Sequence, residues 1–447
     1  MQVTSPTRPA HRPRGRRLRR GPAAPVSCLL LALLASGAAE PALAEPAPTG
    51  VRAYLFTADG LVPLDLRTRT TGPLIPLPGR PADVVISPNG STAWVIVGGA
   101  LRRVVLGTGS VGPPVALEGA PAGLALAPDG ATLYVITSRF TEGGGRFIPV
   151  DTATSRSRPA IPVDDVLEPE ALALTPDGRT ALIAGGCDVG AVYVVDLVHR
   201  ETRTRVGLPA NGNYPCPTSV AVAPDGRTAY AGDRFSTAGL TPIDLATEQA
   251  RPPIVLNEVY AYPMVTPDST KVYVERDDGT SIVDVATGHV DNRFDLDGRF
   301  AVQPSGSTVL FVRPDGGVAP LVTATDTLRS PFATGVRAVD LVFGPAQAPV
   351  AAFRAGDGPG RSVLLDATAS AGVTSPIASY TWRFGDGSSR TTRDPRTSHT
   401  YTRAGRYTVR LTVTDTSGAS TTRLYGSTML LRNGGPRATT TRSVGVP

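Results

Sequence analysis

The stretch APDGATLYVI, residues 127–136, recurs along the chain in related forms. A Pro-Asp-Gly turn between two apolar runs is typical of antiparallel strands joined by a tight hairpin. The other copies are SPNGSTAWVI (87–96), TPDGRTALIA (175–184), APDGRTAYAG (223–232), TPDSTKVYVE (266–275) and QPSGSTVLFV (303–312). Their turn prolines, at 88, 128, 176, 224, 267 and 304, follow one another at 40, 48, 48, 43 and 37 residues. Such a period indicates a repeat architecture built from one supersecondary unit.

Each repeat contains four short apolar segments, most clearly between residues 124 and 163. The segments there are LALA (124–127), TLYVIT (132–137), RFIPVD (146–151) and AIPV (160–163). They predict a four-stranded antiparallel meander. Four strands in each repeat of about 40 to 45 residues are typical of a β-propeller.

The two ends of the repeat region contain incomplete copies. Residues 53–70 have the second and third strands of a repeat with no first strand before them, and VRAVDLVFGP (336–345) resembles a first strand with no second after it. Together they make one further blade. We therefore predict an all-β, seven-bladed propeller over residues 45–345, closed by pairing of its C-terminal strand with its N-terminal strands, which removes open sheet edges.

The repeat resembles the YVTN family of β-propellers, which is found in secreted and surface-layer proteins. The resemblance covers roughly residues 50–345. It rests on the PDGxTxYV pattern and on a later V-D-x-A-T motif, seen as VDTAT (150–154), IDLAT (243–247) and VDVAT (283–287). Leu106 and Thr323 depart from it, near the expected Asp. We expect the recurring aspartates to form Asx turns at strand ends, since a ring would hold them far apart; they are Asp151, Asp196, Asp244 and Asp284.

From Ala348 onward the pattern changes to strands with alternating apolar residues. Tyr407, Val409, Leu411 and Val413 alternate with polar residues, which predicts one buried and one exposed face. Over about 85 residues, 348–432, this predicts a β-sandwich that encloses Trp382. The tail, residues 433–447, is polar and is expected to be disordered.

This second region resembles a PKD domain, an immunoglobulin-like module. The resemblance rests on YTWRFGDG, on HTY followed by GRYTVRLTV, and on TDTSG. It implies that Asp386 caps backbone amides in the FGDG turn. Family members serve as spacers or adhesive modules that contact polysaccharide or protein. AGVTSPI (371–377) replaces the acidic turn of many members, so the resemblance does not carry a calcium site to this chain. Exposed arginines of the domain fit either a solvated strand face or an acidic polymer.

The first 44 residues read as an export signal. Six arginines from Arg12 to Arg20 precede the apolar run CLLLALLASGAA, and Ala42-Leu43-Ala44 fits a signal peptidase. The general secretory and twin-arginine routes both stay open. The leader holds seven Arg and one Glu, so the remaining chain has 37 basic and 37 acidic residues. We therefore expect a secreted or cell-surface protein that is monomeric, has no nucleic-acid partner and does not insert into a membrane.

Cys187 and Cys216 are the cysteines that follow the leader. In an exported protein an even pair favours a disulfide, and the propeller topology places both on the face of the long loops. Loops on a rigid scaffold concentrate binding residues. The candidate ligand-binding residues on that face are Arg139, Asp188, Tyr214, Asp233, Arg234, Arg276, Asp277, Arg313 and Asp315.

No familiar catalytic or metal set emerges from the sequence. His199, His289 and His399 follow the leader, and none pairs with another at metal-ligand spacing. We expect no cofactor and no metal. The sequence favours a non-enzymatic binding or scaffold protein. The alternative is a propeller-class enzyme, a lactonase or a polysaccharide lyase or hydrolase, with a channel site lined by Arg and Asp.

Overall fold

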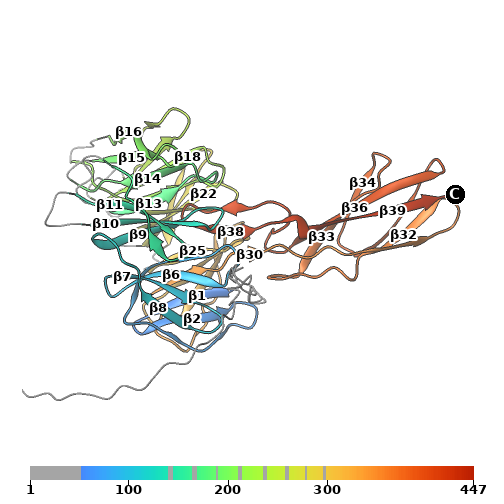
Figure 1. The fold of residues 1–447 in the computed structure, drawn as a ribbon, viewed down its shortest axis with the longest axis horizontal. Coiled ribbons are helices and arrows are strands. Elements are labelled where there is room, and N and C mark those ends of the chain that lie inside the picture. Colours follow the sequence, from blue (N-terminus) through green and yellow to red (C-terminus); the bar gives the residue numbers. More distant parts are fainter. Residues whose placement is uncertain are drawn as a thin grey trace, which may run out of the picture. The chain divides into compact units, whose positions relative to one another are not determined.

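The computed structural model describes residues 52–138, 144–163, 169–187, 190–209, 214–234, 239–256, 261–276, 279–294 and 298–447. These ranges fold as β-strands with a single 3-10 turn (Figure 1). The export signal predicted for residues 1–44 lies outside them.

Seven antiparallel sheets make up the repeat region (Figure 1). The first combines β29 (Asp340–Phe343), β1 (Arg52–Thr57), β2 (Gly60–Asp65) and β3 (Thr70–Thr71), with β4 (Ile75–Pro76) also on β2. The second contains β5 (Pro81–Ile86), β6 (Thr92–Val97), β7 (Ala100–Val105) and β8 (Ser110–Pro114). The third contains β9 (Ala120–Leu126), β10 (Thr132–Ser138), β11 (Arg146–Asp151) and β12 (Arg156–Ser157).

The remaining four sheets follow the same order along the chain. The fourth contains β13 (Ala171–Leu174), β14 (Thr180–Ala184), β15 (Ala191–Asp196) and β16 (Glu201–Gly207), and the fifth β17 (Pro217–Val222), β18 (Thr228–Asp233), β19 (Leu240–Asp244) and β20 (Gln249–Ala250). The sixth contains β21 (Tyr262–Val265), β22 (Lys271–Arg276), β23 (Gly279–Asp284) and β24 (Val290–Phe294), and the seventh β25 (Phe300–Val302), β26 (Thr308–Val312), β27 (Val318–Val322) and β28 (Thr327–Leu328). The predicted seven blades are confirmed.

The ring is closed by its two ends. β29 pairs antiparallel with β1, with Ala53 opposite Phe343 and Phe56 opposite Asp340. β1 pairs with β2 on its other side. The closing strand thus belongs to the same blade as the N-terminal strands, as the incomplete repeats predicted.

The Pro-Asp-Gly turns of neighbouring blades also pack against each other. In the third blade, Ala131 N donates to Asp129 Oδ1 at 2.9 Å, and Gly130 has a φ of +76°. A Cβ on Gly130 would lie 2.6 Å from Cδ of Pro88 in the preceding blade. The next pair repeats the contact, because a Cβ on Gly178 would lie 2.9 Å from Pro128. In these pairs the proline of one copy therefore packs against the glycine of the following copy.

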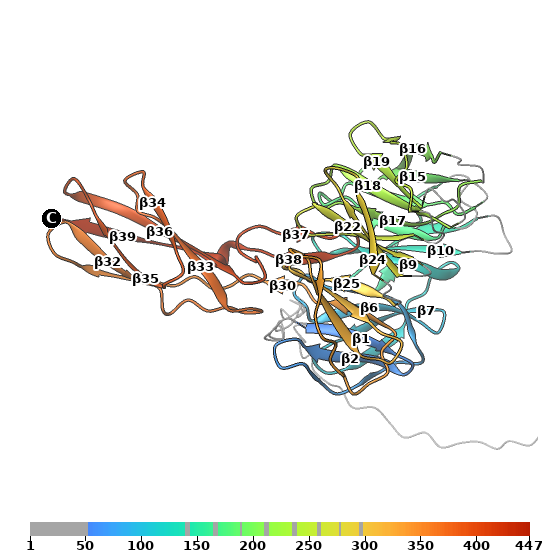
Figure 2. The same cartoon turned by 180° about the vertical axis from the view of Figure 1, so that it is seen from behind.

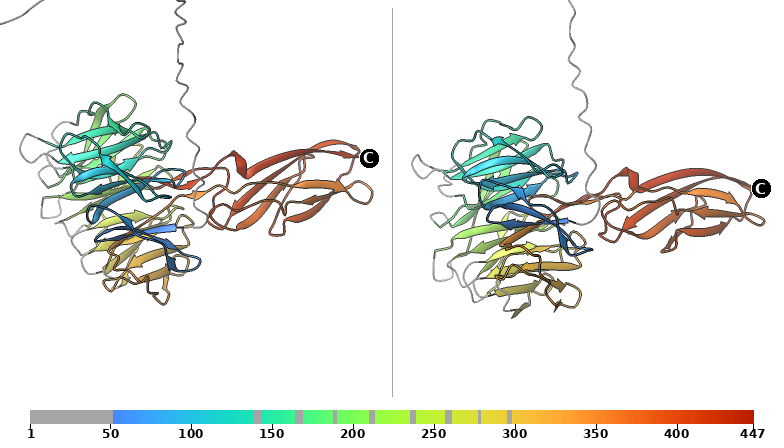
Figure 3. Two further views of the ribbon diagram at one scale, coloured as in Figure 1. Left: turned by 60° about the horizontal axis from the view of Figure 1, so that its bottom comes forward. Right: turned by 90° about the horizontal axis from the view of Figure 1, so that it is seen from below.

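The C-terminal region contains two facing sheets (Figure 3). One contains β34 (Ser389–Thr392), β33 (Ile377–Arg383), β36 (Gly405–Asp415) and β39 (Thr439–Val446). The other contains β31 (Arg354–Asp357), β32 (Ser362–Asp366) and β35 (Arg396–Thr400). Trp382, Val409, Leu411 and Val413 are fully buried between them, which confirms the predicted sandwich.

The expectation of a disordered tail was wrong. A 3-10 turn, η1 (Pro436–Ala438), leads into β39, which pairs with β36 from Thr439 opposite Thr412 to Val446 opposite Gly405. Val444 and Val446 alternate with polar residues, and both enter the sandwich core. The tail is polar because β39 exposes one of its faces, not because it lacks structure.

Candidate functional site

The first strand of each blade lies at the centre of the ring. These inner strands are β29, β5, β9, β13, β17, β21 and β25, and each packs beside the next around the ring. Each runs toward a turn of the Pro-Asp-Gly type or, for β29, toward Pro345. The centre therefore has one end at these turns and another at the long loops.

A hairpin from the C-terminal region reaches the turn end of this centre. It consists of β37 (Leu424–Tyr425) and β38 (Leu430–Asn433), and β38 also pairs with β30 (Ala346–Gln347). Figure 2 shows these strands beside the inner strand β25. In sequence the hairpin lies between β36 and β39 of the sandwich. It therefore extends from the sandwich domain and packs against the propeller.

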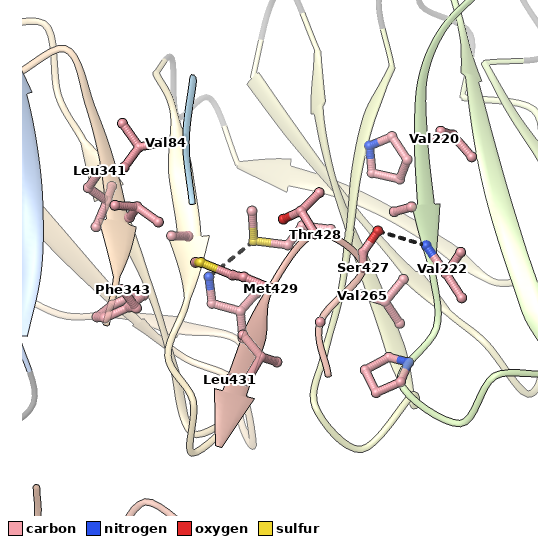
Figure 4. Close-up of a pocket in the computed structure, with 18 residues that line it drawn as sticks. Val84, Val220, Val222, Val265, Leu341, Phe343, Ser427, Thr428, Met429 and Leu431 are labelled. Carbon is pink, nitrogen blue, oxygen red and sulfur yellow. Dashed lines mark hydrogen bonds between the residues drawn. The ribbon is translucent and has the colours of Figure 1, made fainter. Parts of the chain in front are cut away.

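The hairpin tip hydrogen-bonds to the ends of three inner strands. Leu126 N donates to Thr428 O at 2.6 Å, and Leu174 N donates to Ser427 O at 2.7 Å. Val222 N donates to Ser427 Oγ at 3.1 Å, as Figure 4 shows. Three backbone donors that face the centre of the ring therefore find their acceptors in a segment about 200 to 300 residues away in sequence.

Further contacts hold the hairpin in place. Tyr425 is buried and donates its hydroxyl to Leu126 O at 2.6 Å. Met429 packs in the core of the first blades. At the base of the hairpin, Arg432 donates to Pro304 O at 2.7 Å and to Ser305 O at 3.2 Å, and these carbonyls belong to the turn of the seventh blade. Together these contacts join the hairpin to opposite sides of the ring.

A cavity of about 210 Å³ lies beside the hairpin tip (Figure 4). Its walls come from β5, β17, β21, β25 and β29, and Ser427, Thr428, Met429 and Leu431 supply the hairpin side. The other lining residues are mainly Val, Ala, Pro, Leu and Phe. The hairpin tip thus lies among the inner strands at the turn end, with an apolar pocket beside it.

Two aspartates precede the lining residues of neighbouring inner strands. Asp83 accepts hydrogen bonds from Val84 N and Leu124 N, both at 2.8 Å. Leu341 N donates to Asp340 at 2.7 Å. Burial raises the pKa of each carboxyl to about 6, and the charge of Asp340 further raises the pKa of Asp83. Arg299 and Arg80 oppose the shift in the pKa of Asp340.

Arg299 belongs to a charged and aromatic group on the loop side of the ring. Its Nε lies 3.5 Å from Glu275 Oε1, and its guanidinium lies over the Tyr262 ring, 5.1 Å from the centroid. Glu275 is the penultimate residue of β22, Tyr262 begins β21, and Arg299 precedes β25. A planar cation over an aromatic face beside a carboxylate can hold a polar ligand through several hydrogen bonds.

The candidate loop residues have different environments. Tyr214 is 89% exposed, whereas Asp233 is 3% exposed and accepts a hydrogen bond from Cys216 N at 3.0 Å. Arg276 is also buried. Arg234 N donates to Cys216 O at 3.0 Å. Asp233 therefore helps to hold the segment that carries Cys216.

Arg313 and Asp315 lie together in an exposed turn. Gly317 N donates to Asp315 at 2.8 Å, and Arg313 Nε lies 3.4 Å from its carboxylate. The amide of Gly317 is the main cause of a lowered pKa of Asp315. Arg139, Asp188 and Asp277 lie outside the described residues, so a ligand-binding ring formed by the predicted set stays a prediction.

The predicted disulfide is present between Cys187 and Cys216. It joins the segment after β14 to the segment before β17 and therefore links the fourth and fifth blades. Cys216 is fully buried.

Asp386 has the predicted capping role in its turn. Ser388 donates to Asp386 Oδ1 from its amide at 2.9 Å and from its hydroxyl at 2.6 Å. His399 Nε2 lies 2.7 Å from the other carboxylate oxygen, and its ring stacks on Phe384. These contacts lower the pKa of Asp386 to about 2, with the Ser388 hydroxyl the largest cause.

The hairpin is not evident from the sequence. STTRLYGSTML (420–430) falls within the predicted sandwich, whereas Tyr425 and Leu430 pack in the core of the third and fourth blades. Within the described ranges, no helix is long and apolar enough to cross a membrane, and no group of three His, Cys, Asp or Glu side chains is arranged to hold a metal ion.

Comparisons with known proteins support the two-part organisation. Residues 346–428 match the model of the PKD domain family. No curated protein matches the chain. Among solved structures, a functionally unknown protein from Desulfotomaculum acetoxidans DSM 771 is similar with a TM-score of 0.54 and 13% identity, covering 65% of this chain and 98% of that one. Hydrazine synthase from Kuenenia stuttgartiensis gives a TM-score of 0.48 and 22% identity, covering 57% and 86%. At 13% identity the likeness to the Desulfotomaculum acetoxidans protein concerns the fold alone.

Proposed function

We propose that the chain is a secreted, non-enzymatic binding or scaffold protein of the YVTN-like propeller type. In this proposal the loop face of the propeller binds a ligand, and the PKD domain makes contact with an extracellular surface. The disulfide and the PKD domain support an extracellular location, since disulfides persist in oxidising compartments. The export signal predicted for residues 1–44 agrees with this proposal.

The observation that carries the proposal is the insertion of the hairpin. Because the hairpin occupies the turn end of the ring centre, we propose that a ligand approaches from the loop face. Ligand sites are commonly concave, with apolar walls and a few convergent polar groups. Apolar residues of the inner strands line the pocket beside the hairpin tip. On the loop side, Arg299, Glu275 and Tyr262 form a separate group of polar and aromatic side chains that supports binding at that face.

The experiment is a pull-down of the chain from residue 45 onward against insoluble cell-wall, chitin, cellulose and collagen preparations. We expect retention on one of them. Soluble fragments released from the retaining material then serve in a titration with the Arg299→Ala variant, whose affinity we expect to fall about tenfold through loss of a charged contact.

Arg329→Ala is the matched control, because Arg329 is exposed beside the outer strand β28 and its backbone amide bonds to Pro320 O. Its affinity should equal that of the unchanged chain. Turnover of a glycan or lactone by the chain, abolished by Arg299→Ala, would establish the propeller-class enzyme instead. Equal affinities for all three proteins would remove the loop face from the proposal.

A further inference from the structure

The propeller region and the C-terminal region carry opposite charge. Residues 348–447 contain 13 arginines, no lysine, five aspartates and no glutamate, which gives a formal charge of +8. Residues 45–347 contain 24 basic and 32 acidic residues, which gives −8. Without the leader, the formal net charge of the chain is zero. This total combines an acidic propeller region with a strongly basic sandwich. A field of one sign attracts partners of the other.

The arginines of the sandwich include a set on the outer face of one sheet. In β33 and β36, Trp382 lies opposite Leu411, and both are fully buried. The neighbouring positions must therefore point outward. Arg383 lies opposite Arg410 in this register, and both side chains are exposed.

Hydroxyl side chains fill the neighbouring positions of this outer face. The row that contains both arginines runs from Ser389 through Arg383 and Arg410 to Thr441. The next row contains Thr391, Thr381, Thr412 and Thr439, where Thr381 Oγ1 lies 3.1 Å from Thr391 Oγ1 and Thr412 Oγ1 lies 3.0 Å from Thr439 Oγ1. Arg406 is on the same face, four residues along β36 from Arg410, which corresponds to about 13 Å.

The acidic residues of the sandwich lie elsewhere. Within residues 348–447, Asp357 and Asp366 belong to the other sheet, Asp386 and Asp394 lie in turns, and Asp415 is buried. Asp366 pairs with Arg396 on that other sheet. Two like charges directly opposite each other in a sheet are destabilising. Arg383 and Arg410 therefore repel each other on a face that supplies no carboxylate to offset their charge.

We propose that the outer face of β34, β33, β36 and β39 binds an anionic polysaccharide whose carboxylates are held by Arg383, Arg410 and Arg406. A guanidinium fork matches a carboxylate in two parallel hydrogen bonds, and the adjacent Thr and Ser hydroxyls can donate to and accept from sugar hydroxyls. The outer rows contain no aromatic side chain on which a nucleic-acid base would stack. The charge and the chemistry of the face therefore favour an acidic glycan over nucleic acid.

This inference deepens the proposed function, because it names the polymer that the PKD domain contacts. The loop face of the propeller plays no part in it. Arg299→Ala should therefore leave binding of the anionic polysaccharide unchanged, and the two proposals can fail separately.

The test measures binding of the chain from residue 45 onward to polygalacturonate, to neutral dextran and to double-stranded DNA at several salt concentrations. We expect binding to polygalacturonate that weakens with salt, and at least tenfold weaker binding by the Arg383→Thr/Arg410→Thr variant. That variant should melt no lower than the unchanged protein at low salt, because a repulsive pair has been removed. A loss of binding thus cannot be assigned to unfolding.

The control is Arg337→Thr/Arg354→Thr, which removes the same charge from two exposed positions outside the face. Its affinity should stay within about twofold, within the scatter of surface substitutions. If both double variants lost the same affinity for polygalacturonate, net charge alone would explain binding, and the proposed site would be wrong. Binding to DNA at least as tight as to polygalacturonate would overturn the ligand class. Salt-sensitive self-association lost in the first variant, without glycan binding, would assign the face to the acidic propeller of a second copy.

Discussion

Aspartate has two opposite roles in this chain, and its pKa separates them. At the ends of third strands, Asp151 and Asp244 accept backbone amides and an arginine side chain. For both, the pKa is lowered to about 2, with the arginine the largest cause. Asp196 and Asp284 make the same Asx turn. Asp83 and Asp340, in contrast, lie on inner strands where burial raises the pKa to about 6. The aspartates at the ends of third strands therefore recur because they form turns, as the sequence indicated.

The raised pKa of Asp340 predicts a stability that falls as the pH rises. The folded chain holds this proton up to about pH 6, whereas an unfolded chain releases it near pH 4. Between those values the folded state binds more protons, so the free energy of unfolding declines with pH. Asp340→Asn retains an acceptor for Leu341 N and cannot ionise. We expect this variant to gain about 1 to 2 kcal/mol on the unchanged protein between pH 4 and pH 7.

Urea unfolding at pH 4, 5, 6 and 7 measures the difference. Asp315→Asn is a suitable comparison, since the pKa of Asp315 is lowered and its titration should have the opposite sign below pH 4. A constant difference between Asp340→Asn and the unchanged protein from pH 4 to pH 7 would contradict the raised pKa of Asp340.

Among the elements, the hairpin of β37 and β38 contacts residues that are far from it in sequence. Its tip supplies acceptors for Leu126 N, Leu174 N and Val222 N. An inner strand whose terminal amide faced an empty channel would otherwise depend on water for that bond. The hairpin therefore contributes to the stability of the propeller although its sequence lies within the PKD region.

Tyr425→Phe tests this contribution with the loss of one oxygen atom. The change removes the hydrogen bond to Leu126 O and leaves a buried carbonyl without that donor. We expect a loss of about 1 to 2 kcal/mol in the free energy of unfolding and faster hydrogen exchange at Leu126 and Leu174. Tyr407→Phe is the matched control, because the Tyr407 hydroxyl donates to Arg403 O at an exposed site. Equal effects of the two substitutions would exclude a special role for the hairpin contact.

Sequence alone predicted the repeated blades and the sandwich but not the hairpin that links them. The spacing of Pro128 and its counterparts indicated blades, and the orphan strands at residues 53–70 and 336–345 indicated closure. Tyr425 and Leu430 stand in two short apolar runs on either side of Gly-Ser-Thr, and a local pattern does not say which of two cores they enter. The same limit applies to Asp233, since the rotation of a strand end decides whether its side chain lines a rim or supports a neighbouring loop.

At the scale of the whole molecule, three links beyond the sheets of single repeats restrain the ring. β29 pairs with β1, the hairpin contacts inner strands on several sides, and the disulfide joins the fourth and fifth blades. In a repeat protein, each unit contacts chiefly its neighbours, so local opening between two blades is the natural weak point. Links between distant parts of the chain oppose such opening and favour cooperative unfolding.

Removal of the disulfide should expose this weak point at one junction. The bond joins residues separated by 29 positions, and the loop-entropy model assigns it about 3 to 4 kcal/mol. For Cys187→Ser/Cys216→Ser we therefore expect a lower melting temperature and faster amide exchange at Ala231 and Leu182, which lie in the strands on either side of the junction. Leu55 in the closing blade should keep its protection, because β1 retains both of its partners. The unchanged protein with reductant should behave like the variant. Equal acceleration of exchange at Leu55 and at Ala231 would show that the ring opens as a whole and that the bond does not secure one junction.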